Sequence, residues 1–161
     1  MLEDEKKILK LFPLPIFHYK VKDYEKHNEN LTKYIYNLYK NDNDGLKRSN
    51  QGGWHSKPFD LKKKDEAPFL FFMDIQRYVA DVFREYGWFY TPGKVNLTEM
   101  WAIINKKNNF NIEHTHPNNY LSAAYYVKAP ANCGSFNISN PNQIARERIA
   151  ISNKRTEFNQ I

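Results

Sequence analysis

The chain has 161 residues, of which 41% are hydrophobic and 16% aromatic, so it can bury a core of its own. Lys and Arg number 24 against 18 Asp and Glu, but this net charge of +6 is scattered, which argues against a nucleic-acid-binding protein. One cysteine, Cys133, excludes an internal disulfide framework, and the sequence shows neither a signal-peptide core nor a membrane-spanning apolar run. We therefore expect a single cytoplasmic domain with no membrane partner.

The first predicted element is an edge strand in "LKLFPLPIFHYKV", residues 9–21, where two prolines interrupt an alternating apolar pattern. A helix is predicted over residues 28–41, because its apolar residues recur at helical spacing before a polar run that ends at Gly45. A second helix is predicted from Pro68 to a C-terminal cap at Gly87. The polar residues 41–51 between the helices are expected to form a loop.

Short strands are predicted in the second half of the chain. Alternating apolar residues separated by turn-rich stretches place them at residues 95–105, 109–116, 120–129 and 134–139. The order of one strand, two helices and a run of strands indicates an α+β fold, with helices packed on an antiparallel sheet or partial barrel. Residues 1–93 would form a supporting region and residues 94–161 the strand-rich part of one domain, 1–161.

Two histidines, His114 and His116, stand one residue apart at the end of the second of these strands, residues 109–116. Residues i and i+2 of a strand share a face, so both imidazoles could bind one metal ion. The spacing alone also fits two surface polar residues. In the next strand, the face of Ser122, Ala124 and Tyr126 is small with one hydroxyl, which would leave room beside a metal. Asn105 and Glu99 are alternative partners for orienting an imidazole.

Several motifs in order resemble a 2-oxoglutarate/Fe(II)-dependent oxygenase family of the prolyl-hydroxylase-like superfamily. They are "LFPLPIF", "RSNQGGWHS", "MWAIINKKNNFNIEHTHPNNYLSAAYYVKAP" and the glycine-led "GSF", which together run from about Leu9 to Pro141. The resemblance implies a double-stranded β-helix (jelly roll), Fe(II) as cofactor and 2-oxoglutarate as co-substrate. The activity implied is hydroxylation of an unactivated C–H bond.

By position, the resemblance implies that His114 is the first histidine of the metal motif and that His116 stands where the superfamily usually has Asp. It also implies that Tyr126 binds 2-oxoglutarate, with Asn105, Trp101 and Ser122 lining the pocket. The superfamily's third metal ligand is a distal histidine followed by a carboxylate-binding arginine. Neither is found before Ile161, so we expect a truncated form with an incomplete jelly roll. His55, a loop histidine, is a weak candidate for the missing ligand.

Three interpretations remain open at this point. The first is an oxygenase of this family, or a truncated form of one. The second is a non-catalytic binding or structural protein that keeps the oxygenase fold and could be phage-associated, which would place it in the host cytoplasm. The third is a metal hydrolase that uses the two histidines with Glu113 or Glu99 as base, although no HExxH motif supports it.

Absent distal strands would leave an open sheet edge, which favours self-association or a partner chain. The substrate, whether a small molecule or a protein, is not indicated.

Overall fold

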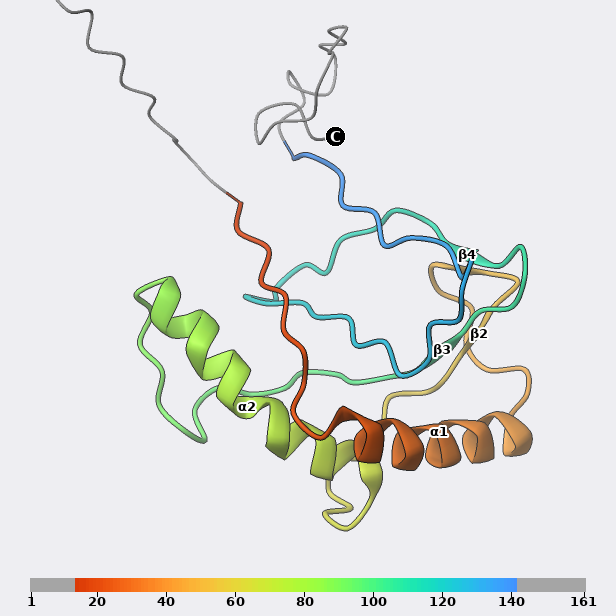
Figure 1. The fold of residues 1–161 in the computed structure, drawn as a ribbon, viewed down its shortest axis with the longest axis horizontal. Coiled ribbons are helices and arrows are strands. Elements are labelled where there is room, and N and C mark those ends of the chain that lie inside the picture. The colour runs from red at the N-terminus through yellow and green to blue at the C-terminus, as the bar shows by residue number, and fades with distance from the viewer. Residues whose placement is uncertain (1–13, 142–161) are drawn as a thin grey trace, which may run out of the picture. The chain divides into compact units, whose positions relative to one another are not determined.

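A computed structural model describes residues 14–141 of the protein. The described part contains two α-helices and two antiparallel sheets of two strands each, which confirms the predicted α+β class (Figure 1). Contacts divide the chain into two units, residues 1–128 and residues 129–161, and the helices and strands found among residues 14–141 belong to the first unit. Neither helix of the described part is long and apolar enough to cross a membrane.

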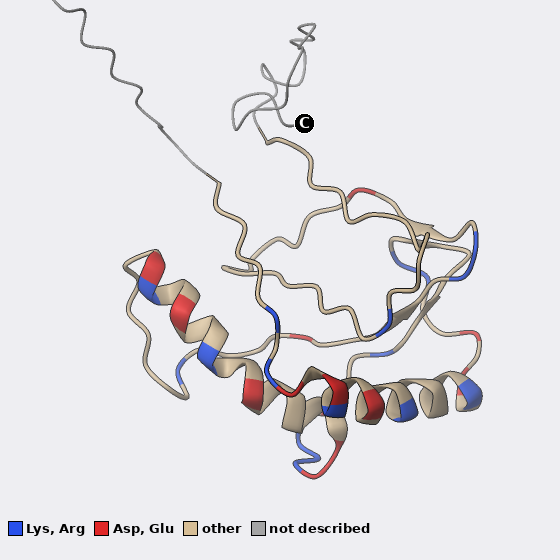
Figure 2. Ribbon diagram, viewed as in Figure 1, with Lys and Arg blue, Asp and Glu red and all other residues tan. Residues whose placement is uncertain are grey.

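Both predicted helices are present. α1 spans Tyr24–Asn41 and α2 spans Ala67–Glu85. Their apolar stripes face each other, and Leu31 from α1 and Phe71 from α2 meet in the core, each only 3% exposed. Acidic and basic residues follow each other along the remaining faces of both helices (Figure 2). α1 begins before the predicted start at Asn28, so that boundary was placed too late.

The end of α2 is fixed by a glycine, as predicted. Gly87 has a φ of +66°, a backbone conformation that a side chain disfavours. Its N–H donates to the carbonyl of Arg84 at 2.9 Å, and the N–H of Trp88 donates to the carbonyl of Phe83 at 2.8 Å. This pair of bonds is a Schellman cap, and the rings of Phe83 and Trp88 meet edge to face across it at 5.4 Å.

Two short ladders join the segment between the helices to the segment after α2. The strands are β1 (Asn50–Gln51), which pairs with β4 (Phe110–Asn111), and β2 (Trp54–His55), which pairs with β3 (Ile103–Ile104). The β2–β3 pairing continues beyond the strands, because the N–H of Ser56 donates to the carbonyl of Ala102 at 2.9 Å. A tight Gly52-Gly53 turn links β1 to β2, and a side chain at Gly53 would collide with the side-chain oxygen of Asn105.

The strand predictions were correct only in part. Residues 95–105 and 109–116 contain β3 and β4, whereas residues 14–21, 120–129 and 134–139 contain no strand. Residues 9–13 of the first predicted strand lie outside the described residues. The stretch 41–51 was predicted as a loop but ends in β1, and β2 was not predicted at all. The described residues therefore do not make up a complete jelly roll.

The N-terminal segment is extended but packs on a helix instead of entering a sheet. Val21 joins the core beside Leu31 and Phe71. The ring of Tyr19 lies 4.9 Å from that of Tyr78, and its hydroxyl donates to Asp81 Oδ2 at 2.8 Å. Pro15 supplies no N–H to a ladder, and the aromatic rings of this segment pack on α2 instead.

Candidate metal centre

The imidazoles of His114 and His116 meet although the β4 ladder ends before them. Their Nε2 atoms lie 3.1 Å apart and their ring centroids 4.9 Å apart. The i, i+2 spacing predicted a shared face, and the rings do converge. His114 is exposed, whereas His116 is partly buried. The pair is thus open to solvent on one side and supported by protein on the other.

The separation of the two nitrogens suits a shared metal ion. Imidazole nitrogens bind metals such as zinc at about 2.0–2.1 Å, so two nitrogens in adjacent ligand positions lie about 3 Å apart. The observed 3.1 Å between His114 Nε2 and His116 Nε2 is close to this separation. Among residues 14–141 no group of three His, Cys, Asp or Glu side chains could hold a metal, so the described part supplies only two ligands.

The orientation of His114 is set by its own backbone. Its Nδ1 lies 2.8 Å from the carbonyl oxygen of Ile112. A carbonyl can only accept, so Nδ1 carries the proton and the Nε2 lone pair of a neutral ring is left free for a metal. This carbonyl takes the place of both predicted partners. Asn105 instead donates to Asn111 Oδ1 at 3.0 Å, and Glu99 is exposed.

His116 is in contact with a tryptophan and, through it, with a second histidine. The ring of Trp101 stacks on His116 at 5.7 Å and 14°, and on His55 at 5.6 Å and 13°. His55 is 7% exposed, and its Nδ1 donates to the carbonyl of Ser56 at 2.6 Å. The structure therefore gives His55 a packing role and does not group it with the two imidazoles as a third ligand.

The segment 120–129 keeps two distinct faces although it joins no ladder. Tyr125 is half-buried: its ring lies 4.4 Å from Phe71 and its hydroxyl donates to Asn28 Oδ1 at 2.7 Å. Tyr126 points the other way and is 55% exposed, and Ser122 on the same face is exposed too. Neither hydroxyl has a hydrogen-bond partner within residues 14–141. The alternation predicted from the sequence is present, with two free hydroxyls on the outer face.

Of the residues predicted to form the site, the structure brings together only three. Trp101, His114 and His116 are joined by ring contacts. No hydrogen bond or ring contact joins Tyr126 or Ser122 to these rings within residues 14–141.

Comparison with known families bears on the segment that carries these residues. Residues 99–160 match a 2OG-Fe(II) oxygenase family. The family model is described as "Putative 2OG-Fe(II) oxygenase", and the match confirms the resemblance drawn from the sequence motifs over this range. It covers less than half of the chain and includes both histidines, Trp101 and Tyr126, but not His55. Searches of curated proteins and of solved structures found no match.

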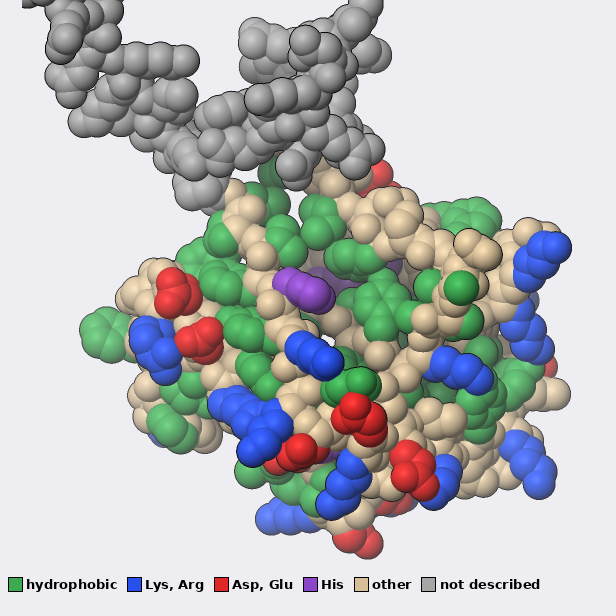
Figure 3. Space-filling view, in the orientation of Figure 1, with side chains coloured by type: hydrophobic (Ala, Val, Ile, Leu, Met, Phe, Trp, Pro, Cys, Tyr) green, Lys and Arg blue, Asp and Glu red, His purple; other side chains and the backbone are tan. Residues whose placement is uncertain are grey.

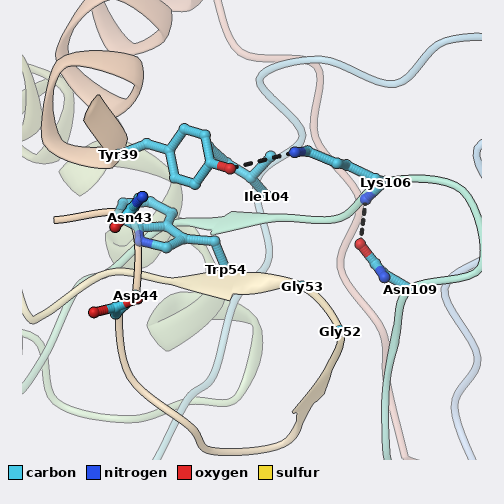
Figure 4. Close-up of a pocket in the computed structure, with 9 residues that line it drawn as sticks. All are labelled: Tyr39, Asn43, Asp44, Gly52, Gly53, Trp54, Ile104, Lys106 and Asn109. Carbon is cyan, nitrogen blue, oxygen red and sulfur yellow. Dashed lines mark hydrogen bonds between the residues drawn. The ribbon is translucent and has the colours of Figure 1, made fainter. Parts of the chain in front are cut away.

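A separate pocket of about 220 Å³ lies beside the β2–β3 pair (Figure 4). Most of the residues that line it lie outside the segment that matches the oxygenase family. Tyr39, Trp54 and the Gly52-Gly53 turn are among the residues that line it, and Lys106 Nζ donates to the Tyr39 hydroxyl at 3.3 Å. Neither His114 nor His116 lines it. None of the residues predicted to bind 2-oxoglutarate lines it either.

The charged side chains around these features form no field of one sign. Acidic and basic side chains are interspersed on the face drawn in Figure 3, mainly over the helices. Several acids are neutralised locally, for example Asp42 by Lys57 at 2.9 Å and Asp81 by Arg84 at 2.7 Å. Electrostatic attraction of a long anionic partner to this face is therefore weak.

Proposed function

We propose that the chain carries the iron-binding part of a 2-oxoglutarate/Fe(II)-dependent oxygenase, with the topology of an incomplete jelly roll. The observation that supports this most directly is the 3.1 Å separation of His114 Nε2 and His116 Nε2 within the segment that matches the oxygenase family. These two nitrogens are the proposed protein ligands of Fe(II). Bound Fe(II) would supply a reaction with O₂, in which 2-oxoglutarate is oxidised to succinate and CO₂ with one oxygen atom and a C–H bond of a second substrate is hydroxylated with the other.

Other residues of the chain would orient the metal ligands and bind 2-oxoglutarate. The Ile112 carbonyl holds His114 in the tautomer that leaves Nε2 free. The exposed hydroxyls of Tyr126 and Ser122 have no partner in the described residues and are the proposed donors to 2-oxoglutarate. Trp101 lies against the metal-binding pair, and Asn105 stands on the same segment, hydrogen-bonded to Asn111. We place this activity in the cytoplasm, where a chain with one cysteine remains reduced.

The proposal is tested by anaerobic titration of the full chain with Fe(II) and 2-oxoglutarate. A weak visible charge-transfer band is expected when 2-oxoglutarate chelates bound Fe(II), and His114→Ala should abolish it. His18→Ala is the matched control, because His18 is exposed and has no contact with the pair. A wild-type chain that gives no band, or a band that survives both His114→Ala and His116→Ala, contradicts the proposed function.

A second candidate is a non-catalytic binding or structural protein, associated with a phage, that keeps the oxygenase fold. One observation favours it: within residues 14–141 the two histidines find no third ligand. Two imidazoles bind a divalent metal less tightly than three ligands do, so this candidate predicts weak metal binding and no turnover of 2-oxoglutarate. Release of CO₂ from labelled 2-oxoglutarate, measured with and without His116→Ala, separates the two candidates.

A further inference from the structure

The two imidazoles of the pair are held in different ways. His114 is fixed by the hydrogen bond from its Nδ1 to the Ile112 carbonyl. His116 has no such bond: its only hydrogen-bonding contact within residues 14–141 is the one between its Nε2 and that of His114. A metal-binding histidine is ordinarily oriented through its second ring nitrogen. No hydrogen bond to Nδ1, the nitrogen that would remain free when Nε2 binds a metal, therefore sets the plane of His116.

We propose that Trp101 is the positioning residue for His116 and that His55 in turn holds Trp101. The inference rests on the proposed function, since it assigns how one of the two metal ligands is oriented. The nearly parallel stack of Trp101 on His116, with 14° between the planes, restricts rotation of the imidazole. The stack fixes the plane of the ring, and the contact between the two Nε2 atoms selects the flipped orientation in which Nε2 of His116 is directed toward His114.

The tryptophan is itself fixed on both its ring and its backbone. Its ring stacks on His55, which is buried and tied to the Ser56 carbonyl. The next residue, Ala102, exchanges two hydrogen bonds with Ser56: its N–H donates to Ser56 Oγ at 2.9 Å, and its carbonyl accepts from the Ser56 N–H at 2.9 Å. Because Ser56 is 2% exposed, this anchor is shielded from water.

Trp101 also differs from the other two tryptophans of the chain. Trp54 donates its indole N–H to the Asp42 carbonyl at 2.7 Å, and Trp88 stacks on Tyr86 at 4.3 Å. Only Trp101 among them contacts imidazoles. The indole of Trp101 therefore contacts two histidines: the buried His55, which has a packing role, and His116, which is a candidate metal ligand.

The test follows the His116 ring in the metal-free full chain by NMR, comparing wild type with Trp101→Leu, Trp101→Phe and Trp88→Leu. An indole stacked on His116 shifts the imidazole proton resonances upfield. Trp101→Leu should abolish that shift, Trp101→Phe should keep part of it, and Trp88→Leu should leave it unchanged. His116 resonances that are the same in Trp101→Leu and in wild type overturn the proposal. Circular dichroism verifies that each variant folds. If Trp101→Leu does not fold, the test is made with Trp101→Phe, in which the upfield shift of the His116 protons should be reduced but not abolished.

A second readout uses Co(II) alone as the probe, titrated by visible absorption. Trp101→Leu should weaken Co(II) binding about tenfold, as is typical when the support of a metal ligand is lost, and Trp101→Phe should restore most of it. His55→Phe should preserve affinity and His55→Leu should lower it. Equal affinities for wild type and Trp101→Leu overturn the positioning role. If the wild type binds no Co(II) while the NMR shift still depends on Trp101, the proposed function fails but the orientation of His116 by Trp101 stands.

Discussion

Tyr125 and Tyr126 are neighbours in the sequence, yet one hydroxyl is tied to a helix and the other is free. Tyr125 donates to Asn28 Oδ1 in α1 at 2.7 Å, whereas Tyr126 is 55% exposed with no partner in residues 14–141. The extended backbone produces this division, because successive side chains point to opposite faces. Substitution of Tyr125 should therefore affect stability, whereas substitution of Tyr126 should affect ligand binding.

The first prediction uses this pair. Tyr126→Phe should weaken binding of 2-oxoglutarate to the Fe(II)-loaded chain about tenfold or more, because a hydrogen bond to a charged group contributes about 1.5–3 kcal/mol. Stability should not change, since the ring is exposed. The measurement is the amplitude of the charge-transfer band against 2-oxoglutarate concentration.

Tyr125→Phe is the matched control for that experiment. It removes the bond to Asn28 and should lower the free energy of unfolding by about 1 kcal/mol while leaving 2-oxoglutarate binding unchanged. If Tyr125→Phe weakens 2-oxoglutarate binding and Tyr126→Phe does not, the assignment of the two faces is wrong.

The second prediction concerns the tautomer of His114. The hydrogen bond to the Ile112 carbonyl requires that His114 carry its proton on Nδ1. In the metal-free chain, the Nε2–H group of His116 must then be the donor, and Nε2 of His114 the acceptor, of the hydrogen bond at 3.1 Å. Long-range ¹H–¹⁵N correlation spectra of the neutral rings should show His114 with a protonated Nδ1 and an unprotonated Nε2. A protonated Nε2 on His114 would contradict the geometry of the pair.

The third prediction concerns Ser56, whose hydroxyl accepts from the buried N–H of Ala102 and donates to the Lys57 carbonyl at 2.7 Å. Ser56→Ala leaves the Ala102 N–H without a partner and should lower the free energy of unfolding by about 1–3 kcal/mol. Ser122→Ala, at an exposed serine with no partner in the described residues, should cost less than about 0.5 kcal/mol. Urea unfolding of both variants makes the comparison, and equal midpoints would show that the Ser56 bond contributes nothing.

The fourth prediction is a pH dependence of stability. Burial, followed by a hydrogen bond to Glu66, raises the pKa of Tyr34 to about 12 from its ordinary value of 10.0. Because the folded chain holds this proton more tightly than the unfolded chain, the stabilisation is complete below about pH 10 and is lost as the pH rises toward 12.

Thermal unfolding measured at a series of alkaline pH values tests this. In Tyr34→Phe the fall of Tm above pH 10 should be shallower than in wild type. The exposed Tyr36, substituted as Tyr36→Phe, is the control. An unchanged alkaline slope in Tyr34→Phe would contradict the prediction.

The helices and the two-faced tyrosine segment could be predicted because both depend on local periodicity. Apolar spacing located α1 and α2, and Gly87 located the end of α2. The same alternation separated Tyr125 from Tyr126. The start of α1 at Tyr24 was missed because no side-chain cap marks it: Asp23 makes no capping hydrogen bond.

The ladders could not be predicted because they join segments far apart in the chain. His55 pairs with Ile103, and nothing near His55 in the sequence specifies that partner. The apparent loop around His55 was therefore misread, although the Gly52-Gly53 turn before an aromatic residue is a signal that could have indicated a strand. The stacking of His55 on Trp101 depends on this ladder, so it could not be predicted from the sequence either.

The close approach of Gly53 to Asn105 couples two regions that otherwise look independent. A methyl group at Gly53 would displace the side-chain oxygen of Asn105, and the same side chain donates to Asn111 Oδ1 in β4 at 3.0 Å. The small size of Gly53 thus preserves a side-chain bond between the segments that contain β3 and β4. A substitution in the Gly52-Gly53 turn would therefore disturb that bond first, although the turn itself contains neither partner.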